Sequence, residues 1–286
     1  MRLRKPTKKP ATSRAEPKTD SKAKPEWILT ILGCGTSTGV PLLFCECKVC
    51  RSKNPKNRRL RTSAWLRIGG KSILIDTSTD LRQQALRERI PRLDAILYTH
   101  PHSDHVSGID EIRSFNYIQK SSIPAYGNAW TCRDLRARFS YLFTTPEKAE
   151  GGGIAHIDLH EFKSSASSID VAGVSVIPIS LSHGREECIG YRFGGLAYVT
   201  DCNGIPPPSM DRLRGLDTLV LDCLRVAPHG THFHLERSLE TVRELRPRRA
   251  VFTHLGHDFD YATWSKKLPK GIALAYDGMR ITGERS

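Results

Sequence analysis

The sequence lacks any long hydrophobic run. No apolar stretch among its 286 residues approaches the ~20 residues that a transmembrane helix needs, so we expect no membrane span. The N-terminal region is positively charged but has no apolar core segment, so we expect no secretory signal and a cytoplasmic protein. No internal repeat of solenoid period is present. The length and a hydrophobic content of 38% suit one large α/β domain or two small ones.

The eight cysteines are unevenly spaced along the chain. Cys45, Cys47 and Cys50 lie within six residues, whereas the other five are scattered. This distribution favours a reducing compartment and one metal cluster over a disulfide framework. Three thiolates need one more ligand to close a tetrahedral zinc site, and His257, three residues beyond His254, is the candidate. We expect one structural zinc there; the alternative is a set of free or redox-active cysteines.

Half of the net charge of +14 lies in the first 25 residues. Residues 1–25 contain nine Lys and Arg against two acidic residues, and almost nothing apolar. We therefore predict a disordered basic tail over 1–25, followed by one ordered domain over 26–286. The tail suits contact with nucleic acid or an anionic surface, or it is merely a solubilising extension. The basic residues between positions 51 and 61 either attract phosphate or form a solvated face.

Apolar segments of the predicted domain alternate between strand and helix patterns. Strands are expected at Trp27–Leu32, Ser63–Ile68, Ser72–Ile75, Ala95–Tyr98, Val174–Ile179, Tyr191–Phe193, Leu196–Thr200, Thr218–Leu221 and Ala250–Thr253. Helices are expected at Leu81–Glu88, Ile109–Ile118, Cys132–Phe143 and Leu235–Leu245. This alternation predicts an α/β fold.

The segment His100-Pro-His102-Ser-Asp104-His105 is the strongest functional signal. It directly follows the predicted strand Ala95–Tyr98 and offers three imidazoles and a carboxylate. Four such ligands are more than one tetrahedral ion shares comfortably, so the segment predicts two ions. A polar surface loop is the alternative, but three histidines in six residues are a rare composition for one.

Three further candidate ligands each follow a predicted strand: His183, Asp201 and His254. Ligands commonly gather beyond the carboxyl ends of strands in α/β sheets, so residues far apart in sequence can meet there. One ion is assigned to His100, His102 and His183, the other to Asp104, His105 and His254, and Asp201 is assigned as the bridge between them.

This ligand set predicts hydrolytic chemistry. Nitrogen and oxygen ligands admit zinc or manganese, and two ions ~3.5–4 Å apart lower the pKa of a shared water that then attacks in line. Asp76 either orients an imidazole or caps a turn. In the histidine-rich loop, His229, His232 or His234 is expected to act as general acid, unless the loop has no chemical role.

The histidine segment, together with His183, Asp201 and His254, resembles the metallo-β-lactamase superfamily. Within it the chain is most similar to the phosphoribosyl 1,2-cyclic phosphodiesterases of the carbon–phosphorus lyase pathway. That similarity is carried by Cys45-x-Cys47-x-x-Cys50, Thr253-His254-Leu-Gly-His257-Asp-Phe-Asp260 and Asp277-Gly-Met279.

The resemblance implies an αββα sandwich of two mixed sheets with the metals at one edge. It also implies that the three cysteines and His257 hold the structural zinc, and that His232 is the general acid beside the catalytic Asp104. Residues 1–25 and the loop 117–161 depart from the family pattern, and we expect the loop to shape the substrate pocket.

Three functions are compatible with these residues. We expect a metal-dependent phosphodiesterase that opens a small cyclic phosphodiester by attack of a metal-bridging hydroxide. A nuclease of the transfer-RNA 3′-processing kind is favoured only by the basic charge. A non-catalytic zinc-stabilised binding module is opposed by the complete ligand set. The expected partner is a small anionic substrate rather than nucleic acid, and a homodimer is compatible with the sequence.

Overall fold

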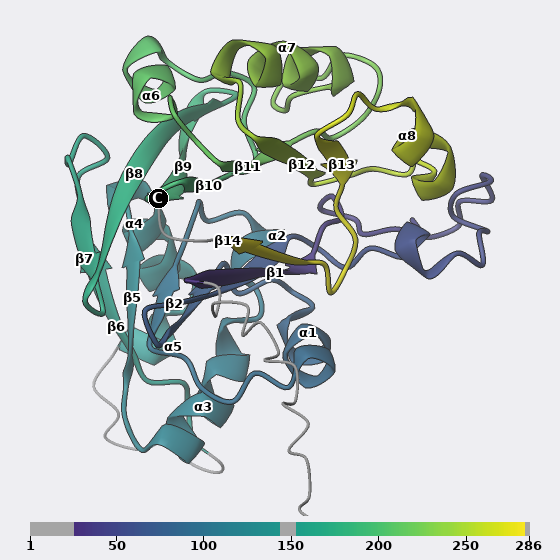
Figure 1. Ribbon diagram of the computed structural model, residues 1–286. Helices are drawn as coiled ribbons and strands as arrows, with labels where there is room; N and C mark the ends of the chain where they lie inside the picture. Colours follow the sequence, from purple (N-terminus) through teal and green to yellow (C-terminus); the bar gives the residue numbers. More distant parts are fainter. Residues whose placement is uncertain (1–25, 144–152, 284–286) are drawn as a thin grey trace, which may run out of the picture.

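The computed structural model describes residues 26–143 and 153–283, so the predicted basic tail lies outside the described residues. In the described part, two seven-stranded sheets face each other and helices cover both outer surfaces (Figure 1). This arrangement confirms the expected αββα sandwich.

The first sheet has the order β14-β1-β2-β3-β4-β5-β6. Strands β14 to β3 pair antiparallel, and β3 to β6 pair parallel. Gly69 and Gly70, both with positive φ, form the tight turn of the β2–β3 hairpin. The strands are β1 (Trp27–Gly33), β2 (Ser63–Ile68), β3 (Lys71–Ile75), β4 (Ala95–Leu97), β5 (Ile123–Gly127), β6 (Ile157–Glu161) and β14 (Arg280–Gly283).

The second sheet has the order β13-β12-β11-β10-β9-β8-β7. Strands β13 to β10 pair parallel, and β10 to β7 pair antiparallel. Both sheets are therefore mixed, as expected. The strands are β7 (Ile169–Val171), β8 (Val174–His183), β9 (Glu186–Phe193), β10 (Leu196–Val199), β11 (Thr218–Asp222), β12 (Arg249–Thr253) and β13 (Ile272–Leu274).

The helices lie outside the sheets, except for one short helix that carries the histidine segment (Figure 1). The first sheet is covered by α1 (Leu81–Glu88), α3 (Ile112–Gln119), α4 (Ala129–Arg138) and α5 (Ser140–Phe143), and the second by α6 (Pro207–Arg212), α7 (Leu235–Leu245) and α8 (Tyr261–Lys267). The histidine segment forms α2 (Ser103–Val106), and 3-10 turns occupy η1 (Pro55–Asn57) and η2 (Ile109–Glu111). Within the described ranges, no helix is both long and apolar enough to cross a membrane.

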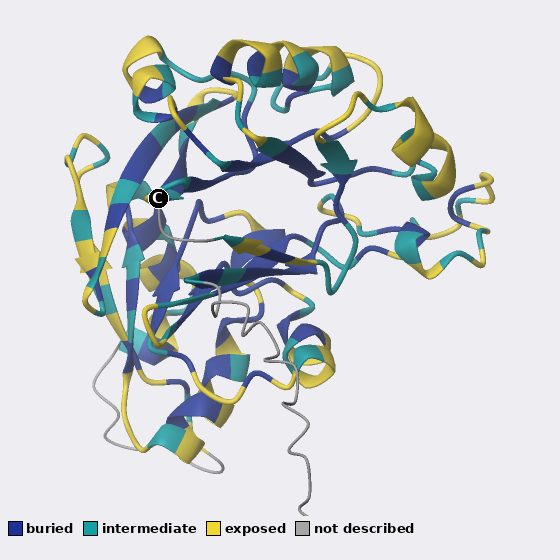
Figure 2. Ribbon diagram, in the orientation of Figure 1, coloured by how far each residue is buried: buried dark blue, intermediate teal, exposed yellow. Residues whose placement is uncertain are grey.

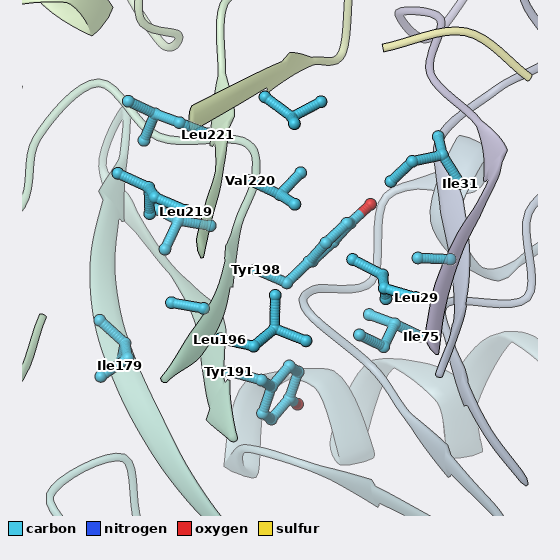
Figure 3. Close-up of a cluster of buried hydrophobic side chains, with 14 of the residues drawn as sticks. Leu29, Ile31, Ile75, Ile179, Tyr191, Leu196, Tyr198, Leu219, Val220 and Leu221 are labelled. Atoms are coloured by element: carbon cyan, nitrogen blue, oxygen red, sulfur yellow. The ribbon is translucent and has the colours of Figure 1, made fainter. Parts of the chain in front are cut away.

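The main core fills the space between the two sheets. Leu29, Ile31 and Ile75 of the first sheet pack toward Tyr198 and Leu219 of the second (Figure 3). Figure 2 shows the facing strands as buried and the outer faces of the helices as exposed. Because both sheets pack on one apolar layer, the positions of their strand ends are fixed relative to each other.

Two hydrogen bonds tie the sheets together just before the histidine segment. The buried hydroxyl of Tyr191 donates to the carbonyl of Tyr98 at 2.5 Å, and the backbone N–H of Ile189 donates to the carbonyl of Thr99 at 2.9 Å. Strand β9 of the second sheet thus holds the residues that follow β4 in the first sheet. His100, the next residue, therefore lies where the two sheets meet.

Several sequence-based boundaries were wrong. The strand expected to end at Ile179 continues to His183, so this histidine ends β8 instead of following it. The helix expected over Cys132–Phe143 starts at Ala129 and breaks at Phe139, giving α4 and α5. The helix expected from Ile109 begins as a 3-10 turn before α3. Strands β5 and β6, inside the segment that aligned poorly, were not expected.

Candidate metal centres

Polar side chains from both sheets meet where their strands end. Asp76 follows β3, and Asp201 and His254 follow β10 and β12. The structure brings all seven predicted ligands of the paired site together in two adjoining groups, one of His100, His102 and His183 and one of Asp104, His105, Asp201 and His254. Within each group the potential ligand atoms lie within 4.8 Å of one another.

The first group consists of three imidazoles. The ring centroids of His100 and His102 are 4.5 Å apart, and each lies about 5 Å from that of His183, at 5.1 and 5.0 Å. The His183 Nε2 is 3.3 Å from the His102 Nδ1. His100 and His183 are buried, whereas His102 is exposed, so this group has one side open to solvent.

The second group is buried throughout. The Nε2 atoms of His105 and His254 lie 3.3 and 3.6 Å from one oxygen of Asp104. Burial disfavours the charged imidazole of His105, but the nearby carboxylates outweigh this effect and raise its pKa well above the ordinary value. In the protein alone, His105 therefore holds a proton that a bound cation must displace.

Asp201 lies between the two groups. Its Oδ2 is 3.2 Å from the His105 Nε2, 3.3 Å from the His254 Nε2 and 3.7 Å from the His100 Nε2. Burial opposes its ionisation, but His254 and His105 outweigh burial and keep the pKa of Asp201 well below the usual range. One carboxylate oxygen thus faces both groups, which is the position expected of a bridging ligand.

Three nitrogens at this junction make no hydrogen bond of suitable geometry to any described residue, although an oxygen of Asp201 lies 3.2 to 3.7 Å from each. They are the buried Nε2 atoms of His100, His105 and His254. Leaving a buried polar atom without a partner costs about 1–3 kcal/mol, so such atoms normally face a ligand. Imidazole nitrogens converging on carboxylate oxygens suit borderline divalent cations. The residues present therefore fit a divalent metal.

The rings are held from behind by the protein. Asp76, for which the sequence left open whether it orients an imidazole or caps a turn, accepts from the His105 Nδ1 at 2.7 Å and from the backbone N–H and hydroxyl of Thr99, both at 2.8 Å. The His183 Nδ1 donates to the carbonyl of Thr231 at 2.8 Å. These bonds direct the Nε2 atoms of both rings toward the centre.

The backbone at three of these positions is in the left-handed region. Asp76, Asp201 and His254 have φ values of 62°, 57° and 56°. Non-glycine residues adopt this conformation at some cost, and such residues gather at functional sites. The strained turns aim the three side chains into the junction instead of along the sheets.

Of the three histidines in the later loop, His232 lies in the site. Its ring stacks on that of His254 with centroids 4.7 Å apart, and its Nδ1 is 3.0 Å from Asp222 Oδ2. Burial disfavours the charged ring, but Asp222 outweighs it and raises the pKa of His232 to about 9. The ring centroid of His229 is 5.3 Å from that of His232. His234 is the residue before α7, and its side chain makes no hydrogen bond that caps this helix.

Asp222 was not predicted from the sequence. It is fully buried at the end of β11, where one oxygen also accepts from the backbone N–H of Cys202 at 2.9 Å. The other oxygen lies 3.9 Å from the His254 Nδ1. Asp222 thus contacts the loop histidine His232 and lies behind the candidate ligand His254. The signal was present, because Asp222 directly follows the expected strand Thr218–Leu221.

The three clustered cysteines surround His257. Its Nδ1 lies 3.3, 3.7 and 3.5 Å from the sulfurs of Cys45, Cys47 and Cys50. All four ligand atoms lie within 4.8 Å of one another. Backbone N–H groups of Leu42 and Cys50 donate to the sulfurs of Cys50 and Cys47, both at 3.4 Å. The bond from Cys50 lowers the pKa of the Cys47 thiol, whereas burial raises the pKa of Cys50 to about 11. This donor set fits a tetrahedral cation.

Part of the basic segment 51–61 has structural partners. Arg59 is buried and donates to the carbonyls of Gly256 and Phe259, and Arg61 makes a two-pronged ion pair with Asp80 at 2.9 Å. These two guanidinium groups thus anchor the loop before β2, which leaves less of the segment to attract phosphate.

Comparison with known proteins supports this fold. A family model described as the β-lactamase superfamily domain matches residues 71–255. A diphosphatase of the PhnP family has a solved structure that is 42% identical, with a TM-score of 0.82, covering 89% of this chain and 96% of that one. Two solved structures share the fold at lower identity. Zinc-bound PqqB from Methylobacterium extorquens is 19% identical, with a TM-score of 0.71, covering 89% of this chain and 99% of that one. Human short-form tRNase Z is 20% identical, with a TM-score of 0.65, covering 89% of this chain and 98% of that one.

A curated relative, an octanoyltransferase from Porphyromonas gingivalis, is 35% identical over 252 residues, or 87% of this chain. The chain spans 50% of the length of that relative.

Fold and site together define a hydrolase of the metallo-β-lactamase fold, a fold that implies divalent metal binding. The chain belongs to the metallo-β-lactamase superfamily and, within it, to the PhnP family.

Proposed function

We propose that this hydrolase opens a small cyclic phosphodiester. The observation that carries the proposal is the oxygen of Asp201, which faces both histidine groups and suits two adjacent cations. The 42% identity to a diphosphatase supports chemistry at phosphorus. The PhnP-like family relationship favours a cyclic phosphodiester as the substrate.

Two divalent ions, zinc or manganese, are proposed for the paired site. The ligands of the first are His100, His102 and His183, and those of the second are Asp104, His105 and His254, with Asp201 shared. When bound, such a pair supplies an activated water and stabilises the charge of an in-line displacement at phosphorus. Asp104 is proposed as catalytic because its Oδ2 lies 3.3 Å from the His105 Nε2 and 3.6 Å from the His254 Nε2, within the proposed site of the second ion.

His232 is proposed as the general acid. Asp222 accepts a hydrogen bond from the His232 Nδ1, which leaves the Nε2 to face the junction between His183 and His254. From there the Nε2 gives its proton to the departing sugar oxygen. Asp222 fixes the orientation and tautomer of the ring and favours its protonated form.

One structural zinc is proposed for Cys45, Cys47, Cys50 and His257. His257 lies three residues after His254, so this ion ties the cysteine loop to the turn that presents a ligand of the paired site. Figure 1 shows the loop between β1 and β2 extending outward below α8. A site closed by four protein ligands leaves no position for water or substrate, so the role of this ion is to stabilise the turn.

A substrate screen tests the proposal. Metal-loaded protein is assayed on a ribose 1,2-cyclic phosphate, a carboxylic ester and a precursor transfer RNA, beside the Asp104→Ala variant. We expect turnover of the cyclic phosphodiester, abolished in the variant. Efficient cleavage of the ester or the RNA with the cyclic phosphodiester untouched would contradict the proposal. The assay with precursor transfer RNA tests the nuclease alternative. A nuclease should also bind RNA with an affinity that falls steeply with salt and depends on residues 1–25.

A further inference from the structure

A groove of about 760 Å³ begins beside the first histidine group. Trp130, in the first turn of α4, lines this groove, and its ring centroid is 6.1 Å from that of His102 and 6.5 Å from that of His100. Glu186 also lines the groove and pairs with His183 across the β8–β9 hairpin. The groove therefore adjoins the candidate active site.

A fixed carboxylate lines the groove. Glu187 accepts hydrogen bonds from the Ser180 hydroxyl at 2.5 Å, the Ser164 hydroxyl at 2.6 Å and the Asn128 amide at 3.1 Å. These donors come from β8, the loop after β6 and the residue before α4, so the carboxylate is held from three sides. A carboxylate offers about four acceptor positions, and three donors leave one for a ligand.

The charges lining the groove balance. Three cationic and three anionic side chains line it, Arg133, Lys163 and Arg212 against Glu161, Glu186 and Glu187. Arg212 is bound to backbone carbonyls of Pro178 and Ala166, at 3.0 and 2.8 Å. An anion deep in the groove would meet the carboxylates, whereas a purely apolar group would strip water from them. The groove suits an uncharged group that is rich in hydroxyls.

The aromatic wall adds a preference for a flat ring. The Trp130 indole is half-buried and stands between the histidine group and the rest of the groove. Stacking on an indole favours any planar base, and carboxylates commonly accept from ribose hydroxyls. The volume lies within the range of pockets that enclose small ligands.

We propose that this groove binds the nucleoside part of a nucleoside-bearing phosphodiester or diphosphate. A ribose hydroxyl donates to Glu187 and the base stacks on Trp130, while the phosphate lies at the histidine groups. The position of the phosphate rests on the proposed function. The assignment of the sugar and base rests on the groove itself.

Binding to the metal-loaded protein tests this proposal. Isothermal calorimetry measures the affinities of AMP, ribose 5-phosphate and inorganic phosphate for the wild type and for Trp130→Ala and Glu187→Gln. The matched control is Glu244→Gln, an exposed glutamate on α7 outside the groove lining. Circular dichroism and thermal unfolding establish that each variant is folded.

We expect the wild type to bind AMP about tenfold more tightly than ribose 5-phosphate, because the base adds a stacking contact. Trp130→Ala should remove this difference. Glu187→Gln should weaken AMP and ribose 5-phosphate about tenfold, because the charged acceptor is lost. Both variants should bind inorganic phosphate as the wild type does, and Glu244→Gln should change nothing.

Three results would overturn the proposal: equal affinities of AMP and ribose 5-phosphate for the wild type, unchanged affinities in Glu187→Gln, or a parallel loss of phosphate binding in the groove variants. The last would show that the side chains only support the histidine groups. Failure to hydrolyse any phosphodiester would instead refute the proposed function and leave these binding differences standing.

Discussion

Replacing Asp76 by Asn should remove the support of His105 while leaving the backbone intact. Asp76 is fully buried, with a φ of 62°, and Asn tolerates this left-handed conformation well. Its two oxygens accept from the Thr99 backbone N–H and from the His105 Nδ1. An amide has only one oxygen. The Thr99 backbone N–H can only donate, whereas the Thr99 hydroxyl beside His105 can also accept, so we expect the amide oxygen to face the backbone and the NH₂ group to face His105.

The magnitude follows from the bond that is lost. A hydrogen bond to a charged group contributes about 1.5–3 kcal/mol, and loss of a residue that orients a metal-bound imidazole costs about 10- to 100-fold in metal affinity. The His105 Nδ1 is 2.7 Å from Asp76, so nearly all of this contribution is at stake. We expect the affinity of one ion of the paired site to fall about 10- to 100-fold.

Competition with a fluorescent chelator at constant pH measures this affinity, and elemental analysis after dialysis counts the ions retained. Asp211→Asn is the control, because Asp211 is an exposed residue of α6 whose ion pair with Arg214 lies on the surface. If Asp76→Asn bound metal as tightly as the control, the argument that Asp76 positions His105 as a ligand would be refuted.

Three further predictions follow from the site. Cys50→Ser should retain one zinc fewer per chain and unfold about 5 °C lower or more, because the cysteine loop loses its link to His257; an unchanged zinc count would refute this. In the metal-free protein the neighbouring carboxylates raise the pKa of His105 despite burial, so metal binding must release a proton from this ring. Metal affinity should therefore rise with pH, and titrations at pH 6 and pH 8 that give equal affinities would contradict this. His232→Asn should lower kcat about 10²- to 10⁴-fold for a sugar leaving group but little for 4-nitrophenolate, which needs no proton, whereas His234→Asn should leave both unchanged; equal losses on both substrates would rule against His232 as the acid.

The sequence predicted the centre of the fold well because its signals are local. Asp201 and His254 each lie two residues beyond a short apolar run, Leu196–Val199 and Ala250–Phe252, and a polar residue at the end of such a run is visible without knowledge of the fold. The histidine segment is likewise contiguous. Asp222, which directly follows Thr218–Leu221, fits the same strand-end rule as Asp201, although it was not predicted.

Other features depend on contacts that no local pattern shows. His183 lies inside β8 because the strand continues in strict alternation, with Ile179, Leu181 and His183 buried and Ser180 and Ser182 less so. The expectation that His183 follows the strand was therefore wrong, because β8 ends at His183 and not at Ile179. The candidate role of His183 is not affected.

The groove beside the site could not be predicted. Trp130 and Glu187 are 57 positions apart and share the groove only through long-range contacts, such as the hydrogen bond that Asn128, the residue before α4, donates to Glu187 of β9. The short parallel strands β5 and β6 enclose that region, and their apolar residues are too few to identify a strand against the surrounding helices.

The most direct test of the central claim is an anomalous-scattering map of crystals grown with zinc or manganese. The account predicts two adjacent peaks that share Asp201, one bounded by His100, His102 and His183 and the other by Asp104, His105 and His254, with a third among the cysteines. A map without density between Asp201 and the histidines would contradict it.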